Sequence, residues 1–335
     1  MKIAINGMGR IGRASLKIIL ETPNLDLVAV NDVVSIETIA YLLKYDSIYG
    51  LYERTVSVDG QNLVIDGKKI KYSSIRNPEE LPWKENNIAL VIESTGLFTT
   101  IDNAKKHIQA GAETVIISAP TNSAEVPVVV HGVNSKQYNS NVFSCASCTT
   151  NNISPIVEII GRRIGIKKAM MTTVHAFTAS QSIVDGPSEK NLRMGRAGSV
   201  NLVPTTTGAA TATTKALPQY SGKFDGVAIR VPIPVGSISD MTFVTERPVT
   251  VEEVNLLIKE EAETERYSKV IDITTEPIVS SDIVKSSFAS TIDLSMTRVV
   301  DGDLLKIMAW YDNEWGFANQ MIREILNFKN NHSKF

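Results

Sequence analysis

The apolar positions in the first half of the chain alternate between short continuous runs and helical periods. Residues 3–5 and 27–30 are apolar runs typical of buried strands, and residues 14–20 between them place apolar side chains at helical spacing. The same order returns with a strand-like run at 89–93 and a helical pattern at 101–110. Strands that alternate with helices predict an α/β fold in this half, of the Rossmann type.

Strand-like runs dominate the second half. Two long runs, 290–300 and 304–311, flank Asp301-Gly302, a dipeptide that favours a tight hairpin turn. An amphipathic helix is expected at 251–262 and a closing helix at 315–328. This pattern predicts a second domain of the α+β class with a largely antiparallel sheet.

Length, composition and charge narrow the class of protein. A chain of 335 residues is long for one core, so two domains are expected. The net charge is −2 and no long basic run occurs, so we expect no obligatory nucleic acid or membrane partner. No apolar stretch reaches the roughly 18 residues of a membrane span. Two cysteines do not make a secreted disulfide framework, and a cytoplasmic location is predicted.

A dinucleotide site is predicted where the first strand ends. Gly7, Gly9 and Gly12 form G-x-G-x-x-G, in which the glycines allow a tight turn, close approach of the pyrophosphate, and close packing of helix on strand. Asp32 follows Gly12 by 20 residues (32 − 12), the spacing of the acid that binds a ribose hydroxyl. A carboxylate there favours NAD over NADP, although a solvated acid at a strand end is the alternative. Residues 94–96, small and polar after a buried strand, could also approach the nucleotide.

Cys148 stands where an apolar helical pattern begins, within Ser-Cys-Thr-Thr-Asn. A helix N-terminus stabilises an anion and therefore biases a thiol towards the nucleophilic thiolate. Pro155 early in the pattern suits a first helical turn and supports a helix start near Cys148. His175, at the end of a strand-like run over 169–174, is a candidate base for the thiol. Taken alone, a buried cysteine and a structural histidine are the simpler interpretations.

Three arginines and a threonine-rich turn could bind phosphate. Arg193 and Arg196 lie in a glycine-containing segment without clear periodicity, and Arg230 ends a strand-like run over 226–229. Residues 204–208 offer hydroxyls and a glycine N–H. Arginine binds phosphate through two parallel hydrogen bonds. Individually, each of these features is also expected of an ordinary surface.

With these residues identified, the chain resembles the phosphorylating glyceraldehyde-3-phosphate dehydrogenases over essentially its whole length. The segments that carry the resemblance are residues 5–13, 146–151, 175–178, 204–210, 229–232 and 310–316. The resemblance implies an NAD-binding Rossmann domain at 1–147, completed by a C-terminal helix at 312–335, and a catalytic domain at 148–311. It also implies a homotetramer in which the region from Thr178 to Ser199 lies between subunits.

The resemblance assigns roles to individual residues. Cys148 would be the nucleophile and His175 its base. The residues expected to hold the substrate phosphate and inorganic phosphate are Ser147, Thr149, Thr178, Arg196, Thr207, Gly208 and Arg230. Those expected to contact NAD are Asn6, Gly7, Gly9, Arg10, Ile11, Gly12, Asp32, Arg76, Thr95, Gly96, Ser118 and Asn313. No metal is expected, because a zinc site would need a second cysteine pair.

The implied reaction is oxidation of glyceraldehyde 3-phosphate to 1,3-bisphosphoglycerate through a thiohemiacetal and a thioester on Cys148. The alternatives are an erythrose-4-phosphate dehydrogenase, an aspartate-semialdehyde dehydrogenase and a non-catalytic NAD-binding scaffold. Residues 204–210 and 310–316 argue against the first two, and the set of Cys148, His175 and Arg230 argues against the third. Spacing alone motivates one further hypothesis, that Cys145 captures an oxidised Cys148 as a disulfide.

Overall fold

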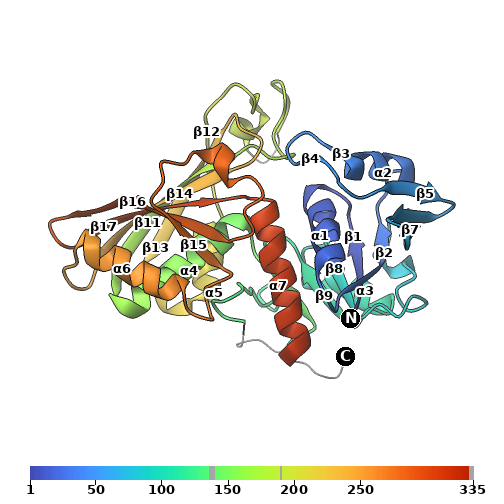
Figure 1. The fold of residues 1–335 in the computed structure, drawn as a ribbon, viewed down its shortest axis with the longest axis horizontal. Helices are drawn as coiled ribbons and strands as arrows, with labels where there is room; N and C mark the ends of the chain where they lie inside the picture. The colour runs from blue at the N-terminus through green and yellow to red at the C-terminus, as the bar shows by residue number, and fades with distance from the viewer. Residues whose placement is uncertain (136–139, 189–190, 332–335) are drawn as a thin grey trace. The chain divides into compact units, whose positions relative to one another are not determined.

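The computed structural model describes residues 1–135, 140–188 and 191–331, and these residues form two compact units (Figure 1). Unit 1 takes those within 1–129, 135–146 and 321–335, and unit 2 takes those within 130–134 and 147–320. The helices are α1 (Arg10–Glu21), α2 (Ile36–Lys44), α3 (Ile101–Gln109), α4 (Cys148–Arg163), α5 (Ala209–Ala216), α6 (Val251–Ala262) and α7 (Trp315–Asn331). Short 3-10 helices span Pro78–Glu80, Leu192–Gly195, Pro218–Tyr220 and Ser280–Ile283.

Unit 1 contains an eight-stranded sheet, as far as its residues are described, in the order β10-β9-β8-β1-β2-β7-β6-β5. Its strands are β1 (Lys2–Asn6), β2 (Asp26–Asn31), β5 (Val56–Asp59), β6 (Asn62–Ile65), β7 (Lys68–Ser73), β8 (Leu90–Glu93), β9 (Thr114–Ile117) and β10 (Val142–Ser144). The strands from β10 to β7 pair in parallel, and β5 and β6 add an antiparallel edge. Residues 3–5 of β1 and 90–92 of β8 are fully buried apolar runs, as expected of a parallel sheet covered on both faces. The expected Rossmann-type fold is therefore confirmed.

Unit 2 contains a seven-stranded sheet, over its described residues, in the order β12-β13-β11-β14-β17-β16-β15. Its strands are β11 (Ile166–Ala176), β12 (Val203–Thr206), β13 (Phe224–Val231), β14 (Ser237–Thr245), β15 (Ile271–Thr274), β16 (Ser290–Val300) and β17 (Leu304–Tyr311). Two pairs, β11 with β13 and β15 with β16, are parallel, and the other four pairs are antiparallel. The predicted largely antiparallel sheet is confirmed. A short pair, β3 (Tyr45–Asp46) with β4 (Gly50–Leu51), stands apart from both sheets.

The element boundaries that the sequence predicts best are set by one turn dipeptide and one helix cap. Asp301 and Gly302 both adopt positive φ, 50° and 75°, and join β16 to β17 as a tight hairpin. Helix α6 spans the predicted 251–262, and its cap Thr250 accepts a hydrogen bond from the backbone N–H of Glu253. Both boundaries follow from local chemistry that the sequence displays.

Two strand ends differ from prediction. Strand β11 continues through His175 to Ala176, and β13 continues through Arg230 to Val231. Both strands therefore run further than the apolar runs that revealed them, because pairing between neighbouring strands continues at polar positions. His175 and Arg230 are the penultimate residues of their strands and are held by the sheet itself.

Candidate active site

The position of Cys148 is set by the start of helix α4. Ser147 is the N-cap, and its Oγ accepts a hydrogen bond from the backbone N–H of Thr150 at 3.1 Å. The predicted helix start at Cys148 is confirmed, but the reasoning from Pro155 was wrong. Pro155 is the eighth residue of the helix and lies beyond its first turn. The serine cap marks this helix start.

The sulfur of Cys148 faces the imidazole of His175. Cys148 Sγ lies 3.4 Å from His175 Nε2, across 27 residues of sequence. On the other side of the ring, His175 Nδ1 lies 2.6 Å from the carbonyl oxygen of Ala176. Donation from Nδ1–H to that carbonyl leaves the Nε2 lone pair to accept the thiol proton. The structure thus brings the predicted nucleophile and base into contact.

Arg230 stands beside His175 because the two residues are register partners in the parallel pair β11 and β13. Arg230 Nη1 donates to the Ala176 carbonyl oxygen at 3.2 Å and lies 2.7 Å from His175 Nδ1. Arginine can only donate, so this second contact is a hydrogen bond only in the other tautomer, which carries its proton on Nε2, and the mechanism requires the tautomer in which Nδ1 donates to Ala176. Its Nε is buried and has no hydrogen-bond partner. An unsatisfied, buried guanidinium donor beside a nucleophilic sulfur is a fitting ligand for a phosphate oxygen.

Burial dominates the ionisation of the catalytic pair. Burial, with the nearby Arg230 charge second, lowers the pKa of His175 to about 3. Burial also raises the pKa of the Cys148 thiol, against the opposing effect of Arg230. Both directions favour the neutral thiol and the neutral imidazole, so the thiolate bias expected from the helix start is wrong, because burial outweighs it. His175 is thereby kept ready to accept a proton at Nε2.

A chain of buried hydroxyls lies next to Cys148. Thr149 Oγ1 is 4.0 Å from Cys148 Sγ and 2.9 Å from the hydroxyl of Tyr311. The Tyr311 hydroxyl is in turn 2.8 Å from Thr173 Oγ1. The ring of Tyr311 also packs edge-on against His175, with 5.9 Å between ring centroids. The sequence analysis assigns no role to Tyr311 or Thr173. The signal that could have found them is a hydroxyl group on a buried position of a strand, because such a group needs a hydrogen-bond partner.

The other predicted phosphate residues of unit 2 lie in exposed turns and loops. Arg196 is exposed and forms an ion pair with Asp185 at 2.9 Å. Thr178 is half-buried, and its hydroxyl is 2.9 Å from that of Ser180. These contacts join neither residue to the Cys148 and His175 pair, so their phosphate roles remain predictions.

Thr207 and Gly208 lie where helix α5 begins. Gly208 is the N-cap, and the Thr207 hydroxyl accepts a hydrogen bond from the backbone N–H of Ala209 at 3.2 Å. No atom lies within 4 Å of the point where a Cβ on Gly208 would stand. The space at Gly208 would admit an anion, and the phosphate role of both residues stays a prediction.

In unit 1, the predicted cofactor residues gather around one pocket of about 270 Å³. Those that line it are Asn6, Gly7, Gly9, Asp32, Arg76 and Thr95. A Cβ on Gly9 would have no atom within 4 Å, whereas a Cβ on Gly12 would stand 2.0 Å from the carbonyl oxygen of Gly7. Gly9 therefore leaves room at the N-terminus of α1, and Gly12 permits close packing of α1 on the turn after β1. This arrangement fits a bound pyrophosphate.

Asp32 keeps its carboxylate at the edge of the pocket. Its Oδ2 accepts a hydrogen bond from the backbone N–H of Met8 at 2.6 Å, and its Oδ1 accepts one from Val34 at 3.1 Å. These bonds tie the glycine turn to the end of β2. The carboxylate is thereby oriented where a ribose hydroxyl could donate to it.

Five other predicted NAD residues belong to unit 1 but not to this lining: Arg10, Ile11, Gly12, Gly96 and Ser118. The Arg10 guanidinium pairs with Asp46 at 2.7 Å and stacks over the ring of Tyr49. Asn313 belongs to unit 2, where its Oδ1 accepts hydrogen bonds from the backbone of Gly236 and the hydroxyl of Ser237. Their contacts with NAD remain predictions.

A buried polar network that sequence reasoning missed supports the pocket from behind. Glu93 Oε2 accepts from Asn6 Nδ2 at 2.6 Å and contacts His107 Nε2 at 2.9 Å. Glu93 Oε1 accepts from both the backbone N–H, at 2.8 Å, and the hydroxyl of Thr95. The indole N–H of Trp83 donates to His107 Nδ1 at 3.0 Å, so the remaining ring proton sits on Nε2 and points at Glu93. Two pocket residues, Asn6 and Thr95, are thus held by one carboxylate.

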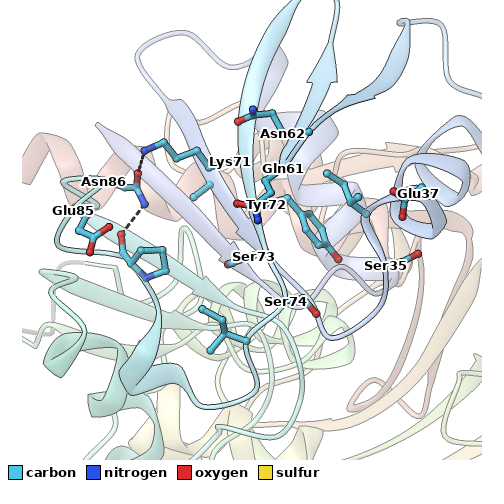
Figure 2. A pocket seen from close by; sticks show the side chains of 15 residues that line it. Ser35, Glu37, Gln61, Asn62, Lys71, Tyr72, Ser73, Ser74, Glu85 and Asn86 are labelled. Carbon is cyan, nitrogen blue, oxygen red and sulfur yellow. Dashed lines mark hydrogen bonds between the residues drawn. The ribbon is translucent and has the colours of Figure 1, made fainter.

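A second hollow of unit 1, of about 750 Å³, lies between β6, β7 and the segment 82–86 (Figure 2). Figure 2 shows Lys71 pointing at Asn86, and the Lys71 Nζ to Asn86 Oδ1 distance is 2.5 Å. Asn86 also donates to the carbonyl of Pro82 at 2.7 Å. None of the predicted site residues lines this hollow.

The described residues contain no cluster suited to a metal ion and no helix suited to a membrane span. Within 1–135, 140–188 and 191–331, no group of three or more His, Cys, Asp or Glu side chains could hold a metal ion. No helix in the same residues is long and apolar enough to cross a membrane. Neither cysteine takes part in a disulfide within the described residues, and Cys145 is buried.

Comparison with known proteins gives two family matches and a set of full-length relatives. Residues 1–101 match the family profile described as the NAD binding domain of glyceraldehyde 3-phosphate dehydrogenase, and residues 147–313 match the C-terminal domain of the same enzyme. Glyceraldehyde-3-phosphate dehydrogenase 2 of Streptomyces avermitilis is 46% identical over 326 residues. The glyceraldehyde-3-phosphate dehydrogenases of Geobacillus stearothermophilus and Zymomonas mobilis are 45% and 44% identical. In each case the match covers 96% of this chain and 96% of the relative.

Proposed function

Because the chain belongs to the glyceraldehyde-3-phosphate dehydrogenase family, we propose that Cys148 and His175 are the nucleophile and base of its NAD-dependent oxidation of glyceraldehyde 3-phosphate. The observation that carries this assignment is the 3.4 Å contact between Cys148 Sγ and His175 Nε2. The unsatisfied Nε of Arg230 beside that pair supplies the cation for a phosphate. No observation favours an erythrose-4-phosphate dehydrogenase or a non-catalytic scaffold.

The neutral pair explains how the first half of the reaction proceeds. His175 Nε2 takes the thiol proton as sulfur attacks the aldehyde carbon, and the proton passes to the new oxyanion to give a thiohemiacetal. His175 then takes that hydroxyl proton back as the carbon loses hydride, which leaves a thioester on Cys148. The covalent intermediate divides one difficult oxidation and acyl transfer into two steps. Inorganic phosphate then attacks the thioester carbon, the Cys148 thiolate leaves, and 1,3-bisphosphoglycerate forms.

NAD⁺, when bound, supplies the hydride acceptor. In unit 1, the open space at Gly9 would receive the pyrophosphate, and Asp32 would accept hydrogen bonds from a ribose. Asn6 and Thr95 would complete the pocket, held in place by Glu93. Asn313 of unit 2 is proposed as a further contact. We assign residues 1–147, with the C-terminal segment 312–335 that contains α7, to this NAD-binding role and residues 148–311 to catalysis; residues 332–335 of that segment lie outside the described part of the chain.

The phosphate groups are proposed to bind around the starts of α4 and α5. Ser147, Thr149, Thr207 and Gly208 would hold inorganic phosphate, and Thr178, Arg196 and Arg230 would hold the substrate phosphate. Arg196 would have to exchange its ion pair with Asp185 for the phosphate. Since both groups of that pair are more than half exposed, the pair costs little to break.

A homotetramer is proposed for the working enzyme. Exposed apolar side chains support it: Ile183 is 82% exposed, Leu192 is 84% exposed and Leu202 is 70% exposed. All three lie in or next to the region expected between subunits, where a second copy would cover them. A cytoplasmic location is also proposed, because the mechanism requires Cys148 as a free thiol.

The test is NADH formation from glyceraldehyde 3-phosphate, measured with and without inorganic phosphate. The expected result is one NADH per active site without phosphate and sustained turnover with phosphate. A Cys148→Ser variant, which keeps the volume of the side chain but loses the thiolate, should form none. Turnover in that variant would exclude Cys148 as the nucleophile.

A further inference from the structure

We propose that Thr173, Tyr311 and Thr149 form a relay of hydroxyl groups whose protons point towards the anion site beside Cys148. In this relay Thr173 donates to Tyr311, Tyr311 donates to Thr149, and Thr149 donates to inorganic phosphate. Tyr311 and Thr173 are then positioning residues for the phosphate that cleaves the thioester. The inference rests on the proposed function, in which Thr149 binds that phosphate.

The three hydroxyl groups form a continuous chain of contacts, and all three residues are buried. Its two hydroxyl contacts measure 2.8 Å and 2.9 Å, both good distances for O–H···O bonds. Tyr311 is 2% exposed, Thr173 is 1% exposed and Thr149 is 4% exposed. The three residues come from β17, β11 and the first turn of α4. The sheet therefore holds Thr173 and Tyr311, and Thr149, at the other end of the relay, lies next to Cys148.

The direction of the protons follows from counting donors. Each hydroxyl has one proton, so three hydroxyls in a row either all donate the same way or, if both threonines donate to Tyr311, leave the buried Tyr311 proton without an acceptor among the three. Pointing inward, the relay would end on the carbonyl oxygen of Ile238, which is 3.4 Å from Thr173 Oγ1 and belongs to the interior strand β14. Pointing outward, the relay ends on an anion, which forms a stronger hydrogen bond than a neutral carbonyl does.

An anion beside Thr149 therefore selects the outward direction. Hydrogen bonds in a row polarise one another, so the donor strength of Thr149 depends on Tyr311 behind it. Burial raises the pKa of Tyr311, and this keeps the phenol protonated and able to donate. The Tyr311 hydroxyl has its hydrogen-bond contact with Thr149, which in turn lies 4.0 Å from Cys148 Sγ.

The experiment compares Tyr311→Phe with Tyr267→Phe. The control makes the same substitution at another buried tyrosine of unit 2, whose hydroxyl donates to Glu158 Oε2 at 2.7 Å. Tyr311→Phe is expected to raise the KM for inorganic phosphate about 2- to 10-fold, the range for net loss of one hydrogen bond between neutral groups. The first-turnover burst of NADH should keep its rate, because acylation needs no phosphate. Tyr267→Phe should leave the phosphate KM unchanged.

A double-mutant cycle with Thr149→Val decides whether Tyr311 acts through Thr149. Adding Tyr311→Phe to Thr149→Val should raise the phosphate KM no further. Thr173→Val, one step back in the relay, should raise it about 2- to 3-fold. Additive effects of the Tyr311 and Thr149 changes, or an unchanged phosphate KM in Tyr311→Phe, would overturn the relay. If Tyr311→Phe fails to fold, the Thr173→Val result decides alone.

The proposed function fails in a different way. Absence of an NADH burst in the unaltered enzyme would refute the thioester mechanism itself, whatever the relay variants do. A normal burst, with an unchanged phosphate KM in Tyr311→Phe and Thr173→Val and a raised one in Thr149→Val, would leave the proposed function standing and remove only the relay.

Discussion

Replacing Glu93 by glutamine is expected to loosen the NAD pocket by removing one hydrogen-bond acceptor from a fully buried network. The Oε2 atom of Glu93 accepts hydrogen bonds from Asn6 and His107. Its Oε1 atom accepts hydrogen bonds from the backbone N–H and the hydroxyl of Thr95. An amide has only one oxygen, so one pair of donors must face its NH₂ group. Trp83 fixes the ring protonation of His107, so His107 cannot turn into an acceptor without losing its bond to the indole.

The arrangement of the glutamine amide with the lowest free energy turns the new NH₂ group towards Thr95. The Thr95 hydroxyl can rotate and accept a hydrogen bond, but the Thr95 backbone N–H cannot. One buried donor is then left unsatisfied, which costs about 1–3 kcal/mol. Amide exchange in β8 and the turn after it, measured by mass spectrometry, should therefore accelerate about 5- to 150-fold. NAD should bind more weakly, because Thr95 lines the pocket.

Glu79→Gln is the matched control for this prediction. The Glu79 side chain is 45% exposed and lies 3.8 Å from Lys106, an exposed pair that contributes at most about 1 kcal/mol. The Glu79→Gln variant should keep the amide exchange rates in β8 and the NAD affinity of the unaltered protein. If Glu93→Gln behaves in the same way, the carboxylate does not hold Thr95 and the reasoning fails.

Three further predictions concern the catalytic base, its titration and the glycine turn. His175→Asn should lower the oxidation rate by about 10²- to 10⁴-fold, measured as the NADH burst, and an unchanged burst would exclude His175 as the base. Because the folded state lowers the pKa of His175 from 6.5 to about 3, the stability linked to its neutral form is fully present above pH 6.5 and is lost as the pH falls towards 3. The thermal-stability difference between the unaltered protein and His175→Asn should change in that direction across this window, and a constant difference would contradict the low pKa. Gly12→Ala should weaken NAD binding at least about 10-fold by calorimetry, because its Cβ would stand 2.0 Å from the Gly7 carbonyl oxygen, and unchanged affinity would show that α1 can shift freely.

Local chemistry explains which parts of the fold the sequence predicts well. The Asp301-Gly302 hairpin and helix 251–262 depend on a turn dipeptide and a threonine cap, signals that need no distant partner. The start of α4 at Cys148 was also predicted, although the proline argument was wrong and Ser147 is the cap. The sequence places His175 and Arg230 at the ends of their strands, whereas each strand continues for one more residue, because apolar runs end before the pairing does.

Long-range contacts explain what the sequence could not predict. The Tyr311 hydroxyl meets Thr149 across 162 residues, and Asn6 meets Glu93 across 87. No spacing rule connects such pairs, since they depend on which strands become neighbours in a sheet. The resemblance implies which residues bind ligands. Only the structure shows that Glu93 contacts Asn6 and Thr95, and that Tyr311 contacts Thr149.

The parallel register of β11 and β13 has a consequence for how this chain can diverge. Eight consecutive pairs, from Ala169 with Phe224 to Ala176 with Val231, bring His175 and Arg230 to one face of the sheet. Inserting a single residue within β13 ahead of Arg230 would move its guanidinium to the opposite face, because side chains alternate along a strand. Insertions in the connection between the two strands leave the pair intact. Length variation among active relatives is therefore expected in that connection and not within either strand.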